Sequence, residues 1–404
     1  MFDSILPIEP IWLVMDIHLQ LEEELKLQAV LALKPLIVGQ CLNSIRNNWA
    51  TFWRRLTCDS QLRWIGPEKG ALHMATGAIV NAIWDAIAKI ECKPLWKLLV
   101  DMEPEQLVDV IDFHYITDAL TKDEALEMLR QNRKFRSERE TVLRESGFPA
   151  YTTGVGWVGY DEEKRRKLCR EALAAGYKRF KAKVGTTIEE DRKRLQIIRE
   201  EIGNECLLMV DANQKWEVNE AIETMSKLTQ FNLLWIEEPT SPDDILGHAA
   251  ISRALAPHGI GVATGEQCQN RIIFKQLLSS RAIQFCQIDS CRVGGVNELL
   301  SIMLMAHKFS IPVCPHAGGV GLCEYVQHLS MWDYVALGGS FENRMIEFIP
   351  HLSEHFHFPA KCEQGRYLVP EQPGYSAQMK DSSIEEYEFP NGPYWTKRAS
   401  DSKQ

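Results

Sequence analysis

Seven ionisable side chains follow short apolar runs at a nearly regular spacing between residues 180 and 350. The successive steps are 28, 26, 29, 23, 27 and 31 residues, a period that accommodates one strand, one helix and two loops. In a parallel barrel the C-terminal ends of all strands face one mouth, so residues far apart in sequence converge there. The series therefore predicts an active site built from Lys183, Asp211, Glu237, Glu266, Asp289, His316 and Glu347.

The middle of the chain alternates between strand and helix patterns. YTTGVGWVGY predicts a first strand and turn, and DEEKRRKLCREALAAG predicts a charged amphipathic helix. Thr187 with Glu190 predicts a capping box, and Ser241 with Asp244 predicts a similar helix start with Pro242 in the first turn. With the first strand included, the sequence predicts eight strands and an α/β fold of the TIM-barrel type.

The chain divides into three expected regions. Residues 1–145 are expected to be mainly helical, because isoleucines recur at helical spacing in AIVNAIWDAIAKI and no convincing alternating strands occur. Within this region, 121–146 is rich in charge, which is typical of a solvated helix or a mobile excursion. The barrel is expected over 146–355. Residues 356–404 are expected to return to the N-terminal region and to end in a disordered tail, TKRASDSKQ.

Composition excludes several functional classes. A net charge of -10 and a pI near 5.7 disfavour a nucleic-acid or anionic-membrane surface. The sequence has no run of about 18 apolar residues, so no membrane span is predicted. The first 30 residues carry six acids, one lysine and no arginine, the opposite of a mitochondrial transit peptide.

The cysteine content favours an intracellular, reducing compartment. The chain has 11 cysteines and no C-x-x-C pair, which predicts buried thiols instead of a disulfide framework. Cys314, His316 and Cys323 could be read as zinc ligands, but apolar packing of the two cysteines is the favoured interpretation.

Three consecutive members of the series are carboxylates. Asp211, Glu237 and Glu266 would repel one another at a shared mouth unless their pKa values rise or a cation lies among them. Each taken alone is compatible with an N-cap or a surface acid. Together, all-oxygen ligands favour a hard ion, and three protein ligands leave positions for water or substrate, which suits Mg²⁺ better than Ca²⁺.

Acid and base candidates flank this expected metal site. Lys181 and Lys183 lie on the same side of one strand, where each ammonium group is expected to lower the proton affinity of the other and to make Lys183 a general base. His316 follows the next strand after Asp289, which can fix its tautomer and stabilise its charged form. Glu347 is expected either to orient substrate or to form a strand-end salt bridge.

This arrangement fits α-proton abstraction from a carboxylate substrate. A divalent ion binds the carboxylate, a base removes the α-proton, and a β-leaving group departs with acid help. Asn213, two residues past Asp211, is expected to make a polar contact near the metal.

The chain resembles the enolase superfamily, in its mandelate racemase subgroup. KAK at 181–183, DAN at 211–213, WIEEP at 235–239, TGEQ at 264–267, Asp289, His316 and Glu347 match its pattern. Further segments resemble the L-fuconate dehydratases. They are RWIGPEKG at 63–70, PLWKLLVDM at 94–102, WIEEPTSPDDILGHA, TGEQCQNR, QIDSCR and VCPHAGGVGLCE.

The resemblance implies a modified (β/α)₇β barrel with an α+β cap made from both chain ends. It also implies a hydro-lyase of carbohydrate acid catabolism in L-fucose degradation, located in the mitochondrion or cytoplasm, and a homo-oligomer remains possible. Lys183 would abstract the C2 proton of L-fuconate and His316 would assist departure of the 3-hydroxyl, giving 2-keto-3-deoxy-L-fuconate. The implied Mg²⁺ ligands are Asp211, Glu237 and Glu266, and the implied substrate contacts are Lys181, Asn213, Glu266, His316, Ala317, Gly318 and Glu347.

The N-terminus departs from this pattern. Family members begin with antiparallel cap strands whose loops close over substrate, whereas MFDSILPIEPIWLVMDIHLQLEEELKLQ has no matching pattern, so these strands are expected to be replaced or missing. Two alternatives to a dehydratase stay open, the first because the same Lys and His could serve it and the second because of the altered N-terminus. One is a racemase or epimerase on the same barrel, and the other is a catalytically impaired binding or regulatory protein.

Overall fold

The computed structural model describes residues 20–66 and 68–401. The segment 1–19, on which the targeting and altered-lid predictions partly depend, lies outside the described residues. So do residues 67 and 402–404.

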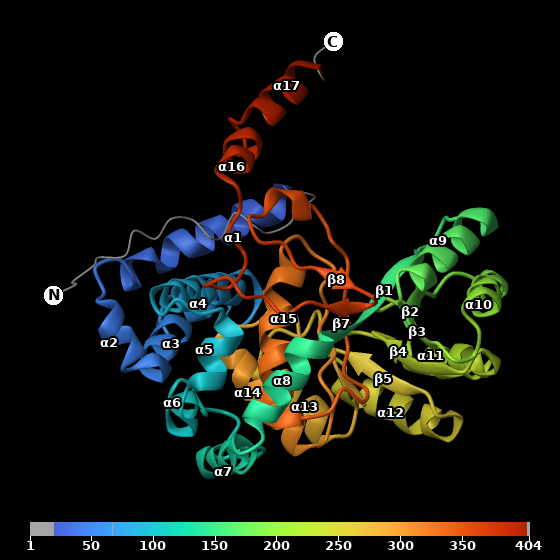
Figure 1. Cartoon of the computed structure of the whole chain (residues 1–404), viewed down its shortest axis with the longest axis horizontal. Helices are drawn as coiled ribbons and strands as arrows, with labels where there is room; N and C mark the ends of the chain where they lie inside the picture. Colours follow the sequence, from blue (N-terminus) through green and yellow to red (C-terminus); the bar gives the residue numbers. More distant parts are fainter. Residues whose placement is uncertain (1–19, 67, 402–404) are drawn as a thin grey trace.

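A parallel barrel forms the centre of the described chain, with helices arranged around it (Figure 1). Successive strands pair in parallel from β1 to β6, and β7 closes the sheet against β1. The strands are β1 Phe148–Gly156, β2 Arg179–Lys183, β3 Leu207–Asp211, β4 Leu233–Glu237, β5 Gly261–Thr264, β6 Phe285–Cys286 and β7 Ile346–Glu347. The intervening helices are α9 Glu162–Ala174, α10 Ile188–Ile202, α11 Val218–Ser226, α12 Ile245–Leu255, α13 Arg271–Ser279, α14 Val296–Lys308 and α15 Leu322–Asp333.

The predicted strand before His316 is reduced to one bridge, in which Val313 pairs in parallel with Cys286. Pro312 and Pro315 flank it, and proline has no N–H to donate to a strand ladder. The segment still lies between β6 and β7, because the backbone N–H of Glu347 donates to Pro315 O at 3.5 Å. The barrel thus has eight strand positions, as predicted, but the one before His316 is irregular and forms a single bridge.

The two predicted helix starts have different outcomes. The capping box of Thr187 and Glu190 is confirmed at the start of α10. The prediction for α12 is wrong in register, because Asp244 is the N-cap and its side chain accepts a hydrogen bond from the Gly247 N–H. Pro242 therefore lies before the helix. Residues 241–244 form a turn before the helix, in which the Asp244 N–H donates to Ser241 O at 3.0 Å, and aspartate is itself a favoured N-cap residue.

The regular elements among the described residues before Phe148 are helices, and no strand element occurs there. They are α1 Gln20–Leu33, α2 Leu42–Arg46, α3 Trp49–Thr57, α4 Gly70–Ile90, α5 Leu95–Asp101, α6 Pro104–Asp109, α7 Lys122–Arg133 and α8 Arg136–Ser146. The charged segment 121–146 therefore forms two helices, and only a few of their residues are buried.

Helix α4 is the central helix of this region and packs against α1, α3 and α14. It is long and apolar enough to cross a membrane, contrary to the expectation from composition, but 78% of its most apolar window is buried inside the protein. Ile79, Ile83 and Ile87 are buried, whereas Ile90 is 57% exposed. This pattern of burial is that of a core helix of a globular protein.

The C-terminal segment returns to both parts of the chain. Its hairpin, β8 Cys362–Glu363 and β9 Arg366–Tyr367, pairs antiparallel with β1. Beyond the hairpin, the Tyr375 N–H donates to Asp85 of α4 at 2.7 Å. Helices α16 Asp381–Tyr387 and α17 Pro393–Asp401 extend away from the body (Figure 1). The structure thus has helix up to Asp401 in a segment expected to be disordered.

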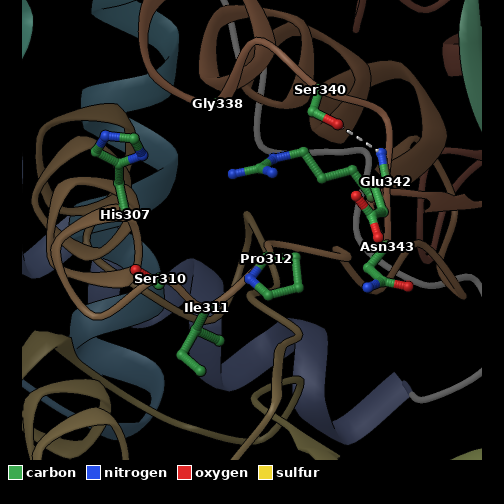
Figure 2. Close-up of a pocket in the computed structure, with 9 residues that line it drawn as sticks. His307, Ser310, Ile311, Pro312, Gly338, Ser340, Glu342 and Asn343 are labelled. Carbon is green, nitrogen blue, oxygen red and sulfur yellow. Dashed lines mark hydrogen bonds between the residues drawn. The ribbon is translucent and has the colours of Figure 1, made fainter.

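The barrel interior is filled by side chains and is not a pore. Its separate core cluster consists of Tyr151, Met209, Trp235, Ala263, Phe285, Cys314 and Met345. A cavity of about 310 Å³ lies outside this packing (Figure 2). It is lined by Pro312 and Asn343, which precede the Val313 bridge and β7, so it lies at the N-terminal ends of these strands. This end is opposite to the predicted site.

All 11 cysteines lie in the described ranges and are free thiols. The prediction that they are buried is wrong for Cys41, Cys58 and Cys92, which are exposed on the helical N-terminal region. Cys314 and Cys323 are buried, and their thiols contact the carbonyl oxygens of Asn343 and Ile349. These backbone contacts favour the packing interpretation over the zinc interpretation.

Candidate active site

The C-terminal ends of β2, β3 and β4 bring two lysines and two carboxylates together. Lys183 pairs with Asp211 in the strand register, and Asp211 pairs with Glu237. Lys183 Nζ lies 2.6 Å from Asp211 Oδ2, and Lys181 Nζ lies 2.5 Å from Glu237 Oε1. Parallel pairing without a register shift at these ends therefore converts the sequence period into direct side-chain contact.

Asp211, Glu237 and Glu266 form a cluster suited to a hard cation. One oxygen from each residue lies within 4.8 Å of the others, and no other group of this kind occurs in the described ranges. Asp211 and Glu237 are fully buried. Burial and the like charges of Asp211, Glu266 and Glu347 raise the pKa of Glu237 to about 8, against the effect of Lys181. A divalent cation would remove this repulsion, so the donor set fits Mg²⁺.

The loop that carries Glu266 leaves no space for a side chain before it. Gly265 has φ +149°, and a Cβ there would lie 2.4 Å from the backbone oxygen of Gln287. Close approach of the two loops therefore requires glycine at this position of TGEQ. It places Glu266 against the segment that leads to Asp289.

The electrostatics of Lys181 correct one prediction. Burial opposes its charge, but Glu237, Glu347 and Asp211 raise the pKa of Lys181 well above its usual value. The expectation that the two ammonium groups lower each other's pKa is therefore wrong for Lys181 among the protein groups alone. The surrounding carboxylates outweigh the neighbouring lysine.

Asp289 is buried and pairs with His316, which is partly exposed. Asp289 Oδ2 lies 2.8 Å from His316 Nδ1, and His316 Nε2 lies 3.6 Å from Glu266 Oε2. Burial opposes the imidazolium, but Glu266, Asp289 and Glu347 raise the pKa of His316 to about 10. The ring can therefore carry a proton toward the carboxylate cluster while Asp289 fixes its orientation.

Glu347 is an internal acceptor. Its Oε1 lies 3.4 Å from Lys181 Nζ, and its Oε2 accepts from the Ala317 N–H at 2.9 Å. The Ala317 N–H is thus bonded within the protein, and contact of substrate with the turn of Ala317 and Gly318 stays a prediction. The Gly318 N–H donates to His316 Nε2 at 3.2 Å. This hydrogen bond requires the neutral ring, because a protonated Nε2 is a donor and cannot accept.

Asn213 contacts the carboxylate cluster through its backbone. It is exposed and has φ +44°, and its N–H donates to Asp211 Oδ1 at 2.8 Å. Because this bond occupies one oxygen of Asp211, it orients the other toward the lysines.

The sequence interpretation missed Glu238 and Gln287. Gln287 donates to Glu237 Oε2 at 2.7 Å, and its place two residues before Asp289 was an available signal. Glu238 is buried, has φ +42°, and accepts from Gln214 at 2.9 Å. Burial with the charges of Glu266 and Asp211 raises its pKa to about 8. The paired acids of WIEEP were the available signal.

This fold and site define a member of the enolase superfamily. A family model described as enolase C-terminal domain-like matches residues 164–383. Together with the full-length similarity described next, this match shows that the chain belongs to the enolase superfamily, in its mandelate racemase subgroup.

The relatives cover most of the chain. Human "Mitochondrial enolase superfamily member 1" is 56% identical over 369 residues, which span 91% of this chain and 83% of that protein. "L-galactonate dehydratase" of Hypocrea jecorina is 54% identical over 355 residues, which span 87% and 78%.

Solved structures show the same architecture. The crystal structure of human mitochondrial enolase superfamily member 1 has a TM-score of 0.92 and 55% identity, covering 93% of this chain and 85% of that one. L-talarate/galactarate dehydratase from Salmonella typhimurium, liganded with Mg and L-lyxarohydroxamate, has a TM-score of 0.69 and 25% identity, covering 90% and 77%.

Proposed function

We propose that this chain is a Mg²⁺-dependent acid-sugar dehydratase that converts L-fuconate to 2-keto-3-deoxy-L-fuconate and water. One observation carries the proposal. A three-carboxylate cluster is flanked by Lys183, 2.6 Å from Asp211, and by His316, 3.6 Å from Glu266. The two candidate proton-transfer groups thus contact different members of the cluster.

Asp211, Glu237 and Glu266 would hold the metal ion. When bound, Mg²⁺ supplies positive charge that offsets the second negative charge developing on the substrate carboxylate as the α-proton leaves. Gln287 and the Asn213 N–H orient two of these ligands, because they bond Glu237 and Asp211.

Lys183 and His316 would perform the two proton transfers. Lys183 would take the C2 proton as general base, and the C2–H electron pair would move onto the substrate carboxylate to give an enediolate. In the next step that electron pair would form the C2–C3 double bond as the C3–O bond breaks. His316 gives its proton to the leaving hydroxyl, which departs as water, and the enol product tautomerises to the 2-keto acid. Asp289 compensates the imidazolium charge before the transfer.

Relatives support the substrate class. Besides L-galactonate dehydratase, the curated relatives include an L-talarate/galactarate dehydratase that is 43% identical over 261 residues, or 64% of this chain. L-fuconate is 6-deoxy-L-galactonate, so the two sugars present the same C2 and C3 centres to the site. The presence or absence of the C6 hydroxyl is then the feature that separates them.

The experiment is a comparison of acid sugars with product analysis. Purified protein is incubated with L-fuconate, L-galactonate or galactarate, with Mg²⁺ or with a chelator, and products are analysed by mass spectrometry. We expect a 2-keto acid that has lost one water, formed with Mg²⁺ only and fastest from L-fuconate. An epimer of unchanged mass would indicate the racemase alternative. No turnover of any sugar by a protein that binds Mg²⁺ would indicate the binding alternative.

The proposal extends to domains and compartment. We propose that the helical N-terminal region caps the barrel of 146–355 and that the C-terminal segment after 355 returns to this cap, which the contact between Tyr375 and Asp85 supports. We also propose a mitochondrial location, which the names of the human and Xenopus laevis relatives support. Fractionation of cells that express the tagged chain tests the location, and recovery outside mitochondria would contradict it.

A further inference from the structure

Glu298, near the start of α14, is a buried carboxylate with both oxygens engaged. Its Oε1 accepts from the backbone N–H of Arg271 at 2.8 Å, and its Oε2 accepts from the backbone N–H of Gly294 at 2.5 Å. Arg271 is the first residue of α13, which directly follows the loop that carries Glu266 after β5. Gly294 lies in the loop after β6 that carries Asp289.

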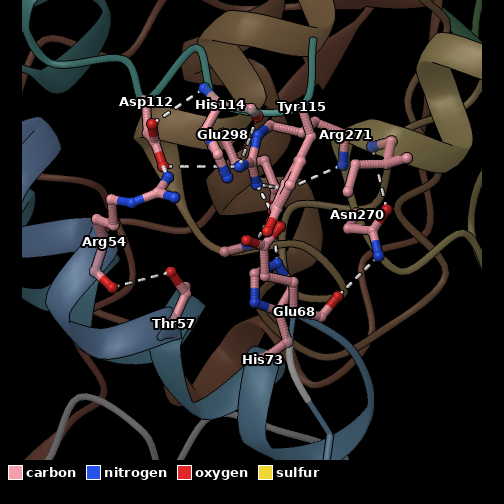
Figure 3. Close-up of polar contacts among 12 residues, drawn as sticks. Arg54, Thr57, Glu68, His73, Asp112, His114, Tyr115, Asn270, Arg271 and Glu298 are labelled. Carbon is pink, nitrogen blue, oxygen red and sulfur yellow. Dashed lines mark hydrogen bonds and ion pairs between the residues drawn. The ribbon is translucent and has the colours of Figure 1, made fainter. Parts of the chain in front are cut away.

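The same carboxylate also contacts the helical N-terminal region (Figure 3). His73 of α4 places Nε2 2.7 Å from Glu298 Oε2. The Arg271 guanidinium lies 3.3 Å from Glu298 Oε1 and 2.6 Å from the Glu68 carboxylate. Three segments that are distant in sequence therefore meet at one side chain.

The packing around this contact leaves little freedom of movement. A Cβ on Gly294 would lie 2.8 Å from the His73 ring and 2.9 Å from the Trp53 ring. Trp53 Nε1 donates to Gly294 O at 2.7 Å, and the Arg271 guanidinium lies 4.7 Å from the centre of the Trp53 ring. The loop after β6 is thus fixed from two sides.

Charge explains why this position is a carboxylate. Burial opposes ionisation, but His73 and Arg271 lower the pKa of Glu298 to about 2. An ionised carboxylate accepts hydrogen bonds from both backbone donors more strongly than a neutral group can. A neutral amide of the same size would direct an N–H group at one of these donors.

We propose that Glu298 is a positioning residue for the proposed dehydration, on which this inference rests: it holds the Glu266 loop and the Asp289 loop at one fixed separation. It touches neither substrate nor metal. Its effect would pass through the placement of Glu266 in the cation site and of Asp289 beside His316, where a displacement of about 1 Å can cost roughly 10²-fold in rate.

The test is the affinity for Mg²⁺ alone, measured by calorimetry without any sugar. We expect Glu298→Gln to bind Mg²⁺ about tenfold more weakly than the wild type, the range found when partners of metal ligands are altered. The matched control is Glu324→Gln. Glu324 is a buried carboxylate on α15 that accepts from the Ala360 N–H at 3.0 Å, and its variant should bind Mg²⁺ within about twofold of the wild type.

Equal Mg²⁺ affinity of Glu298→Gln and the wild type would overturn this inference alone. A wild type that binds Mg²⁺ but dehydrates no acid sugar would overturn the proposed function and leave the positioning result standing. A wild type that binds no Mg²⁺ would overturn both.

Hydrogen exchange in the wild type gives a second test that does not depend on the variant folding. Mg²⁺ binding at Glu266 should slow amide exchange in residues 265–273 and also in 289–297, because Glu298 joins the two loops. Protection confined to 265–273 would contradict the proposal.

Discussion

Lys183 and Asp211 are register partners on β2 and β3, and their side chains form an ion pair of 2.6 Å at the mouth of the barrel. This pair places the candidate base directly beside a candidate metal ligand. His316 contacts Glu266 from another part of the same mouth. The two candidate proton-transfer groups therefore contact different members of the carboxylate cluster.

Asp289→Asn should reduce turnover by roughly 10² to 10⁴-fold, since the loss of general acid catalysis costs about this much. The amide cannot compensate the imidazolium, and it can hold the ring of His316 in the wrong tautomer. Release of the 2-keto acid measures the effect. The control is Asp85→Asn, which alters a buried acid bonded to the Tyr375 N–H and should keep turnover per folded molecule. A near-normal rate in Asp289→Asn would remove the role of Asp289.

Mg²⁺ should raise the free energy of unfolding. A ligand at 100 times its dissociation constant stabilises the folded state by about 2.7 kcal/mol, and thermal unfolding with and without Mg²⁺ measures this gain. Glu237→Gln should lose most of it, because the variant removes one of three clustered oxygen ligands. If the wild type unfolds at the same temperature with Mg²⁺ and with a chelator, the assignment of a Mg²⁺ site to these three carboxylates is wrong.

Glu298 should make folding sensitive to acid. Its folded-state pKa of about 2 lies below the ordinary value of 4.5, so its contribution to stability is present above about pH 4.5. This contribution should decline as the pH falls toward 2, because the unfolded state binds the proton first. Chemical denaturation from pH 5 to 3 should show a steeper loss in the wild type than in Glu298→Gln. Parallel curves would contradict the assignment.

Two isoleucines of α4 test its position in the core. Ile83→Ala should lower the free energy of unfolding by about 2 to 5 kcal/mol, because the side chain is buried. Ile90→Ala removes the same atoms at an exposed position of the same helix and should cost far less. Equal losses in urea denaturation would contradict the burial of Ile83.

The sequence predicted those parts of the site that depend on strand period. Lys183, Asp211 and Glu237 each end a strand, so spacing alone indicated that they meet. The N-cap of α12 was misplaced because Ser241 and Asp244 carry equivalent local signals. The role proposed for Glu298 could not be predicted either, since its side chain bonds the backbone N–H groups of Arg271 and Gly294, which no sequence spacing relates. Likewise, the local sequence pattern could not show that the carboxylates around Lys181 raise its pKa more than Lys183 lowers it.

Isotope exchange in two variants tests the division of roles most directly. The acid sugar turned over fastest is incubated with Mg²⁺ in D₂O, and deuterium at C2 of the recovered substrate is measured by NMR. His316→Asn should release no 2-keto acid but still exchange the C2 hydrogen, because Lys183 removes it and returns deuterium. Lys183→Ala should do neither. Exchange that persists in Lys183→Ala and disappears in His316→Asn would contradict the account.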